Sequence, residues 1–512
     1  MSSEAAHEPV IVAIDAGTTG VRAFAIDVDG RPVGRSYREF TQHFPQPGWV
    51  EHDAAEIWET TATVLAELCG QIGRPVMAVG VTDQRETVVA WDRRTGAPRA
   101  RAIVWQDRRT AARCDELAAA GELDRIRRLT GVVLDPYFSA SKMEWLLRHG
   151  GVEADEHLAF GTIDSWLVWN LTGGASHVTD PSNASRTMLY DICAHEWSEE
   201  LCDLFGVPVT ALPRVLPSAG EFGRTVEGSG LPAGTPITGI AGDQQASLFG
   251  QACVHPGMAK NTYGTGSFVL MNIGPRCPDP AEGLLTTVGW TVPATMLGLP
   301  GGNELVTHYA LEGSIFVTGA AVQWLRDGLG IIEHADEVGP LAASVPDTGG
   351  VVMVPAFTGL GAPDWDPYAR GTVVGITRGT TRAHLARAVV ESMAYQTRDV
   401  VELMTSATGT HLGELRVDGG AAAMDLLLEV QADQLEVPVA RSAVAETTAL
   451  GAALLAGLGA GVWSDVEELA ANWRADARAV PTTDEAERAA ADEAHRMWRR
   501  AVERSLAWAE PS

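Results

Sequence analysis

Two similar turns, about half a chain apart, constrain the fold of this 512-residue sequence most strongly. The segments IDAGTTGVRAF (14–24) and NTYGTGSFVL (261–270) are both rich in β-forming residues, and a short Gly/Thr turn interrupts each of them. Strand and helix patterns alternate through the rest of the chain, which is typical of α/β architecture. The spacing suggests two similar halves that each offer one Gly/Thr loop to a central cleft, with a boundary near QACVHPGM, at about residue 255. The alternative is a chance similarity, since Gly/Thr turns are common.

Four segments have patterns clear enough to predict an element. Residues 10–27 form a strand, a tight turn and a second strand, and residues 384–404 have apolar side chains at helical spacing. Residues 304–316, ELVTHYALEGSIF, combine β-forming residues with a turn. Residues 484–510 are charged and amphipathic, which predicts a long helix that serves simply as a solvated surface helix.

The charge and composition of the chain exclude several functions. A formal net charge of −28 argues against general nucleic-acid binding, which needs a basic surface. The only lysines are Lys142 and Lys260, and neither follows a glycine, so the chain has no GK[ST] phosphate loop. A protein-kinase HRD segment is missing as well. If the protein binds ATP, it must hold the phosphates by another device.

The ends of the chain and its cysteines indicate where the protein works. No apolar run has membrane-spanning length, and the N-terminal residues MSSEAAHEP lack a basic region followed by an apolar stretch. We therefore expect a soluble, cytoplasmic protein without stable membrane insertion. Six cysteines in 512 residues, with no CxxC pair, do not make a disulfide framework, so a reducing compartment is the simplest interpretation.

The turn in DAGTTGVR combines the features of a phosphate-binding loop. Gly17 and Gly20 allow a tight turn whose backbone N–H groups can hold phosphate oxygens, and Thr18 and Thr19 add hydroxyl donors. Asp15 ends an apolar strand, where a buried carboxylate is costly unless it meets a cation. Mg²⁺ beside the phosphates would supply one. Taken alone, the segment fits an ordinary hairpin turn equally well.

Charged residues stand at two other expected strand ends. In VTDQRETVVAWD, Arg85 and Glu86 are adjacent, although neighbouring side chains on a strand point to opposite faces. In GIAGDQQASLFGQ, Asp243 follows an apolar segment, and open α/β sheets bind ligands at such ends. The alternative role for Asp243 is a helix N-cap, since a helical pattern follows it. A further strand runs into the DGG of residues 418–420, where glycines let a flat ring approach the backbone.

Taken in order, these segments resemble those of the glycerol kinases in the FGGY carbohydrate kinase family. The similar stretches include TDQRETVVAWD, AIVWQDRRT, DPYFSASKMEWLL, GIAGDQQASLFGQ, MAKNTYGTGSF, YALEGSIFVTGAAVQWLRD, VPAFTGLGAPDWDPYARG and ETTALGAALLAGL. They follow the family order from residue 11 to about residue 465, and both FGGY signatures are present, around residues 137–145 and 359–379.

The resemblance implies a fold and an activity. The implied fold is α/β, with two actin-like (ribonuclease H-like) ATPase domains around a central cleft, and we place the domains at residues 8–253 and 254–512. The implied activity is ATP-dependent phosphorylation of glycerol to sn-glycerol 3-phosphate, by in-line transfer with Mg²⁺. Because family members are often homo-oligomers, we expect a dimer or tetramer, with glycerol and ATP as partners and no nucleic acid.

The resemblance also assigns residues by position. Residues expected to bind glycerol are Arg85, Glu86, Trp105, Tyr137, Asp243, Gln244 and Phe268. Asp243 is expected to be the general base, and Asp15 the Mg²⁺ ligand. Residues expected along the nucleotide are Thr18, Thr19, Gly20, Arg22, Thr265, Gly319, Gln323, Gly420 and Met424. A donor-only guanidinium beside an acceptor-only carboxylate suits a molecule that carries only hydroxyls, provided that a backbone bend turns both toward it.

The chain departs from the family pattern on the nucleotide side. Glycerol kinases typically have DQGTTSSR where this chain has DAGTTGVR, although other FGGY kinases vary here as well. The asparagine that contacts adenine in the family is replaced by Met424, whose thioether can pack against a ring but cannot make amide hydrogen bonds. We therefore expect weaker or less strict adenine recognition. The segment GRTVEGSGLPAGTP lacks the basic loop and the histidine linked to fructose 1,6-bisphosphate and phosphohistidine control, so neither control is expected.

Two alternative functions remain open at this point. One is an FGGY kinase for another small polyol or triose, such as erythritol or dihydroxyacetone, which the intact glycerol-site residues disfavour. The other is a degenerate, nucleotide-binding regulatory protein. Met424 is its sole support, and the presence of Asp15 and Asp243 argues against it.

Overall fold

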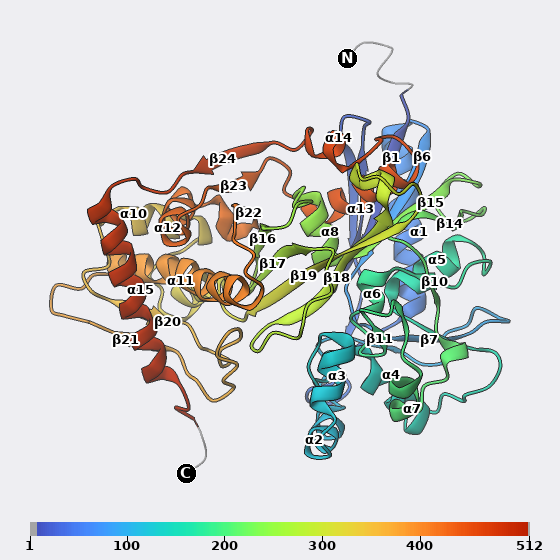
Figure 1. The fold of residues 1–512 in the computed structure, drawn as a ribbon, viewed down its shortest axis with the longest axis horizontal. Helices are drawn as coiled ribbons and strands as arrows, with labels where there is room; N and C mark the ends of the chain where they lie inside the picture. Colours follow the sequence, from blue (N-terminus) through green and yellow to red (C-terminus); the bar gives the residue numbers. More distant parts are fainter. Residues whose placement is uncertain (1–7, 510–512) are drawn as a thin grey trace.

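The computed structural model describes residues 8–509, which form two large mixed β-sheets with helices on their faces (Figure 1). The strands of the first sheet are β1 (Val10–Ala16), β2 (Gly20–Ile26), β3 (Pro32–Glu39), β6 (Val76–Asp83), β14 (Ala219–Arg224) and β15 (Pro236–Gly242). Their order is β14-β15-β6-β1-β2-β3. β1, β2 and β3 pair antiparallel in succession, whereas β1, β6 and β15 pair parallel in succession.

The second sheet repeats this topology. Its strands are β16 (Met258–Tyr263), β17 (Ser267–Gly274), β18 (Leu285–Pro293), β19 (Leu305–Ile315), β22 (Glu414–Gly419), β23 (Val439–Ser442) and β24 (Ala475–Ala479). Their order is β18-β19-β17-β16-β22-β23-β24. β16, β17 and β19 pair antiparallel in succession, and β16, β22 and β23 pair parallel. The two Gly/Thr turns therefore join equivalent hairpins, and the prediction of two ribonuclease H-like halves is confirmed.

Helices cover both faces of the first sheet. Its central strand β1 is buried along almost its whole length, as the apolar run VIVAI predicts. Val12 belongs to a core cluster with α1 (Ala54–Ile72). Ile11 and Ala13 belong to another cluster, with α13 (Thr447–Gly459). Because successive side chains of a strand point to opposite faces, α1 and α13 cover opposite faces of the sheet.

Helix α13 comes from the second half of the chain, yet it lies with α8 (Asp243–Gly250) between the two sheets (Figure 1). Two glycines of the first sheet let it approach at backbone distance. A Cβ on Gly80 would lie 2.1 Å from the carbonyl oxygen of Ala452. A Cβ on Gly239 would lie 2.4 Å from the amide nitrogen of Ala456. The two halves thus share one core, and the expected boundary between two domains stays a prediction.

The remaining elements surround these sheets. In the first half they are β4 (Gln42–His43), β5 (Glu51–His52), β7 (Val89–Asp92), β8 (Ala102–Ile103), β9 (Leu158–Gly161), β10 (Val178–Thr179), β11 (Tyr190–Asp191), β12 (Glu196–Trp197), β13 (Arg214–Val215), α2 (Ala111–Ala119), α3 (Leu123–Thr130), α4 (Ser139–Arg148), α5 (Ile163–Leu171), α6 (Pro181–Ala184) and α7 (Glu199–Phe205). In the second half they are α9 (Gly319–Gln323), α10 (Val338–Ala343), β20 (Val352–Val354), β21 (Thr372–Val374), α11 (Arg382–Thr408), α12 (Asp425–Leu435), α14 (Val466–Ala470) and α15 (Glu485–Ser505). No helix within residues 8–509 is long and apolar enough to cross a membrane.

The turn predicted within residues 304–316 is wrong, whereas residues 10–27 and 384–404 fold as predicted. Residues 305–315 form one continuous strand, β19, which pairs with β17 on one side and β18 on the other. Gly313 lies in this strand where α11 packs on it, since a Cβ there would be 2.3 Å from Cγ1 of Val400. A glycine inside a strand can mark such a close approach instead of a bend.

Helix α15 is more than the solvated surface helix that its charges suggested. It is amphipathic as predicted, but its apolar stripe is buried, and Trp498 is only 1% exposed. Nε1 of Trp498 donates to Oδ2 of Asp399 on α11 at 2.7 Å, and Nε2 of His495 lies 2.8 Å from Oδ1 of the same carboxylate. The helix therefore anchors the end of the described chain to α11.

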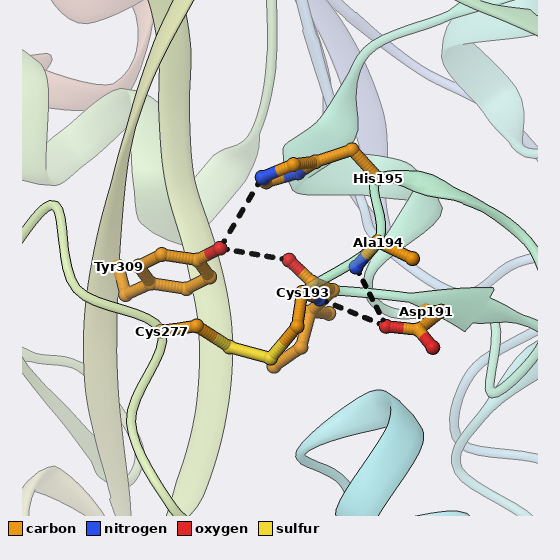
Figure 2. Close-up of a disulfide and its surroundings, with 7 residues drawn as sticks. Asp191, Cys193, Ala194, His195, Cys277 and Tyr309 are labelled. Atoms are coloured by element: carbon orange, nitrogen blue, oxygen red, sulfur yellow. Dashed lines mark hydrogen bonds between the residues drawn. A yellow bond between two sulfur atoms is a disulfide. The ribbon is translucent and has the colours of Figure 1, made fainter.

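A disulfide joins the two halves of the chain. Cys193, in the hairpin between β11 and β12, is bonded to Cys277, which follows β17 (Figure 2). Beside it, the hydroxyl of Tyr309 on β19 donates to the carbonyl oxygen of Ile192 at 2.8 Å, so a hydrogen bond also holds this hairpin to the second sheet. The bond departs from the expectation of a reducing compartment, which rested on six cysteines without a CxxC pair. The cysteine pattern did not predict it, because 84 residues separate the two cysteines in sequence. Within the described residues, the free cysteines are Cys69, Cys114, Cys202 and Cys253.

Replacing Gly239 with alanine should destabilise the protein by about 1–3 kcal/mol, because the added methyl group would overlap the backbone of α13. Urea unfolding measures the change. The matched control is Gly70→Ala, since Gly70 lies at an exposed position of α1 and an added Cβ meets no atom within 4 Å. Alanine there should raise the stability by up to about 1 kcal/mol. Wild-type stability of the Gly239 variant would contradict the close packing.

Candidate active site

The carboxyl ends of three parallel strands meet at one edge of the first sheet. β1, β6 and β15 run parallel and end in register with one another. Asp15 lies near the end of β1, Arg85 two residues beyond β6, and Asp243 directly after β15. This edge is where open α/β sheets bind ligands, so three of the predicted site residues lie at the expected place.

The backbone bends sharply after β6. Glu86 has a left-handed conformation, with φ of 63°, and the N–H of Thr87 donates to the carbonyl oxygen of Arg85 at 2.8 Å. Such a conformation is uncommon outside glycine and is often found at functional sites. The side chains of Arg85 and Glu86 are 2% and 1% exposed, with Nε of Arg85 3.8 Å from Oε1 of Glu86. The bend therefore turns both adjacent charges into one buried cluster, which is the arrangement that joint binding of one ligand requires.

Asp243 joins this cluster from the first turn of α8. Its Oδ1 lies 3.1 Å from Nε of Arg85, and its side chain is 32% exposed. The alternative role as an N-cap is wrong, because the cap residue is Gly242 and no side chain caps the helix. The next residue, Gln244, accepts a hydrogen bond from Nζ of Lys260 on β16. Burial lowers the pKa of Lys260 to about 8.

An aromatic pair lies beside the charges. The rings of Trp105 and Tyr137 are 5.5 Å apart in a T-shaped arrangement, and the Tyr137 hydroxyl accepts from Nη2 of Arg85 at 3.4 Å. Nε1 of Trp105 donates to Oγ1 of Thr18 at 3.0 Å, which links the pair to the Gly/Thr turn of the first half. Phe268 comes from the second sheet, on β17, and packs against the core between the sheets.

The β1–β2 turn has the form of a small closed loop. The N–H of Gly17 donates to the carbonyl oxygen of Gly20 at 3.0 Å, and a Cβ on Gly20 would lie 2.5 Å from the carbonyl oxygen of Arg38. Asp15 accepts from Nη1 of Arg22 at 3.0 Å. Burial raises the pKa of Asp15 to about 6, although Arg22 opposes the shift.

A pocket of about 800 Å³ opens on the second half. Five of the nine residues expected along the nucleotide line it, namely Thr265, Gly319, Gln323, Gly420 and Met424. The remaining four lie at or beside the turn of the first sheet, namely Thr18, Thr19, Gly20 and Arg22. The prediction missed three charged residues of the pocket lining, namely Arg326, Asp336 and Asp425. The second half thus offers a cavity large enough for a nucleotide-sized ligand.

Two buried charges in the polar cluster were not predicted from the sequence. Glu312, on β19, accepts from Arg85, and Arg186, just after α6, donates to Glu86. Both side chains are 0% exposed. Glu312 could have been identified from the sequence, because it is the single carboxylate inside the strand-forming run THYALEGSI. A charged side chain that is buried in a strand needs a partner of opposite charge.

The donor set at the first turn fits Mg²⁺. Asp15 supplies a hard carboxylate oxygen, which this ion prefers, and burial raises the pKa of this carboxyl to about 6 although Arg22 pairs with it. Within residues 8–509 no group of three or more His, Cys, Asp or Glu side chains could hold a metal ion. A magnesium ion here would therefore depend on phosphate oxygens and water for its other ligands, as is common at phosphoryl-transfer sites.

Two ribonuclease H-like halves, with a ligand pocket on one and a buried charged cluster at the strand ends of the other, define an actin-like ATPase fold. Two family models match the chain, those for the N-terminal domain (residues 10–250) and C-terminal domain (residues 259–460) of the FGGY family of carbohydrate kinases. The chain belongs to the FGGY family of carbohydrate kinases.

Individual relatives agree with this assignment. The chain is 54% identical to a glycerol kinase of Dechloromonas aromatica, over 98% of each chain. It is 56% identical to a glycerol kinase of Aromatoleum aromaticum, over 97% of this chain and 99% of that one. Among solved structures, Plasmodium falciparum glycerol kinase with ADP matches with a TM-score of 0.91 and 34% identity, over 98% of this chain and 99% of that one.

Met424→Asn should strengthen the preference for ATP over GTP by about two- to tenfold, because an amide can hydrogen-bond adenine and a thioether cannot. The measurement is KM for Mg·ATP and for Mg·GTP at saturating polyol. Met424→Leu, which keeps the apolar packing, serves as the control and should keep the wild-type ratio. An unchanged ratio in the asparagine variant would show that position 424 does not contact the base.

Proposed function

We propose that this protein transfers the γ-phosphate of ATP to a terminal hydroxyl of glycerol and forms sn-glycerol 3-phosphate. The main support for this proposal is the sequence identity, 54% and 56% over nearly the whole chain, to two proteins named glycerol kinase. The buried cluster of Arg85, Glu86 and Asp243, beside the pair Trp105 and Tyr137, supports it.

The cluster suits a small molecule with several hydroxyls. Arg85 only donates and Glu86 only accepts, so together they can hold hydroxyls in both senses. Gln244 offers an amide, and the faces of Trp105 and Tyr137 offer apolar surface to the carbon side of the polyol. Phe268 would add a further apolar contact from the second sheet.

The proposed reaction is an in-line transfer between the two halves. Asp243 would accept the proton of the hydroxyl as its oxygen attacks the γ-phosphate, while Nε of Arg85, 3.1 Å away, orients the carboxylate. The transition state is usually loose, so positioning and charge stabilisation matter more than proton removal. Asp15 would hold Mg²⁺, which when bound supplies positive charge that offsets the charge of the transferring phosphoryl group.

Residues of both halves would hold the nucleotide. The phosphate-binding residues of this proposal are Thr18, Thr19, Gly20, Arg22 and Thr265. The residues proposed to lie farther along the nucleotide are Gly319, Gln323, Gly420 and Met424, which line the pocket of the second half. Closure of the two halves would exclude water and limit ATP hydrolysis.

Location, domain limits and assembly are part of the same proposal. We place the protein in the cytoplasm, where ATP is available, with domains at residues 8–253 and 254–512. We expect a dimer or tetramer, which light scattering of the purified protein measures.

The test is steady-state phosphorylation with Mg·ATP across glycerol, dihydroxyacetone, erythritol and xylulose. Glycerol should give the highest kcat/KM, because the cluster offers both donors and acceptors for a short triol. A higher value with another compound would identify a kinase for that substrate instead. Nucleotide binding without turnover of any of the four would support a regulatory protein.

Asp243→Asn should lower kcat by about 10²- to 10⁴-fold and leave the affinity for ATP little changed, because the variant keeps its shape but loses its base. Steady-state kinetics and titration calorimetry measure the two effects. The control Asp155→Asn removes a 43% exposed carboxylate that pairs with Arg99 at the surface, and it should keep wild-type kcat. Retained turnover in Asp243→Asn would refute the role of Asp243 as base.

A further inference from the structure

A carboxylate of the second sheet enters the polar cluster of the first half. Glu312 on β19 accepts two hydrogen bonds from Arg85, at 2.6 Å from Nη1 and 3.2 Å from Nη2. It accepts a third, at 3.1 Å, from Nη2 of Arg186. Nε of Arg186 in turn donates to Glu86 at 2.6 Å. Two arginines and two glutamates therefore form one buried network that crosses between the halves.

Glu312 is kept ionised by the opposite charges beside it. Burial alone would raise the pKa of Glu312, but the guanidinium groups of Arg186 and Arg85 outweigh it and lower the pKa to about 2. Glu312 is therefore ionised throughout the physiological range. The paired contact with Arg85 has the bidentate geometry that fixes a guanidinium most strongly. The formal charges of the two arginines and two glutamates cancel, which suits an uncharged substrate.

The pairing determines how Arg85 faces Asp243. Glu312 takes both terminal nitrogens of Arg85, and Gln245 and Tyr137 accept from the same two nitrogens at 3.3 and 3.4 Å. Only Nε is left to contact Asp243. Without the Glu312 carboxylate, the guanidinium would be free to turn and bind Asp243 through two nitrogens. Both carboxylate oxygens of Asp243 would then be occupied, and Arg85 would leave the orientation in which it meets Tyr137.

We propose that Glu312 is a positioning residue of the polyol site, which holds Arg85 in its binding orientation and couples that orientation to the second sheet. This inference rests on the proposed function, because it assigns Arg85 to the substrate. It gives the second half a direct part in polyol binding, in addition to its nucleotide pocket.

The test is Glu312→Gln, which keeps the shape of the side chain but removes its charge. The KM for glycerol should rise about ten- to hundredfold, as expected for loss of charge-assisted hydrogen bonds, while the KM for Mg·ATP stays within about twofold. A purely structural defect would lower the active fraction, and so kcat, without a selective change in the KM for glycerol. Glu312→Asp, which keeps the charge on a shorter stem, should recover part of the loss.

The matched control is Glu144→Gln. Glu144 is also buried, at 3% exposure of its side chain, and also pairs with two arginines, Arg113 and Arg148. The same substitution there should leave the KM for glycerol at the wild-type value. A rise equal to that of Glu312→Gln would show that any buried glutamate–arginine pair has this effect and would overturn the proposal.

A double-mutant cycle tests whether Glu312 acts through Arg85. In an Arg85→Ala background, Glu312→Gln should raise the KM for glycerol by no more than about twofold, because the residue it positions is gone. A full additional increase would overturn the proposal. If Glu312→Gln does not fold, as judged by thermal unfolding, Glu312→Asp is measured in its place, and a wild-type KM for glycerol would then overturn the proposal.

Failure of this inference can be separated from failure of the proposed function. If Arg85→Ala raises the KM for glycerol but Glu312→Gln does not, only the role of Glu312 is wrong. If wild-type protein phosphorylates another polyol, KM for that compound becomes the readout. If it phosphorylates none of the panel, the proposed function fails and the inference fails with it.

Discussion

The backbone contact between α13 and the first sheet is the constraint on which the rest of the structure depends. Gly80 and Gly239 carry no side chain at the points where α13 crosses the sheet, so the helix lies against the strands themselves. Together with α8, the same helix packs in one hydrophobic core that also contains residues of the second sheet. Hydrophobic burial here, and not a linker, fixes how the two halves face each other.

This junction explains why the charged residues are paired as they are. Once the sheets share a core, Arg85, Arg186 and Glu312 have no water to solvate them, and each must find an opposite charge. Removing one partner of such a set leaves a charge buried without compensation, which costs more than an exposed pair contributes. The partners come from both halves, so the same burial that stabilises the fold also sets the orientation of the residues at the strand ends.

Local patterns in the sequence predicted much of the architecture. The Gly/Thr turns, the strand that carries Asp15 near its end and the bend at Arg85 and Glu86 all follow from short-range geometry, which a pattern of neighbouring residues can encode. The predictions failed where the partner is distant in sequence. The turn expected within residues 304–316 is a continuous strand, in which Gly313 allows the approach of Val400, a residue distant in sequence. The bond between Cys193 and Cys277 likewise depends on the packing of separate halves.

The sequence by itself determined the α/β class, the duplicated hairpins and the residue types that stand at the ends of the strands. Only the tertiary structure decided which of those residues meet. Asp243 reaches Arg85 because parallel strands end in register, and Glu312 reaches Arg85 because β19 belongs to a second sheet that shares a core with the first. The physical reason is that hydrogen bonds and ion pairs act over a few ångströms in space, whereas a sequence records only the order of residues along the chain.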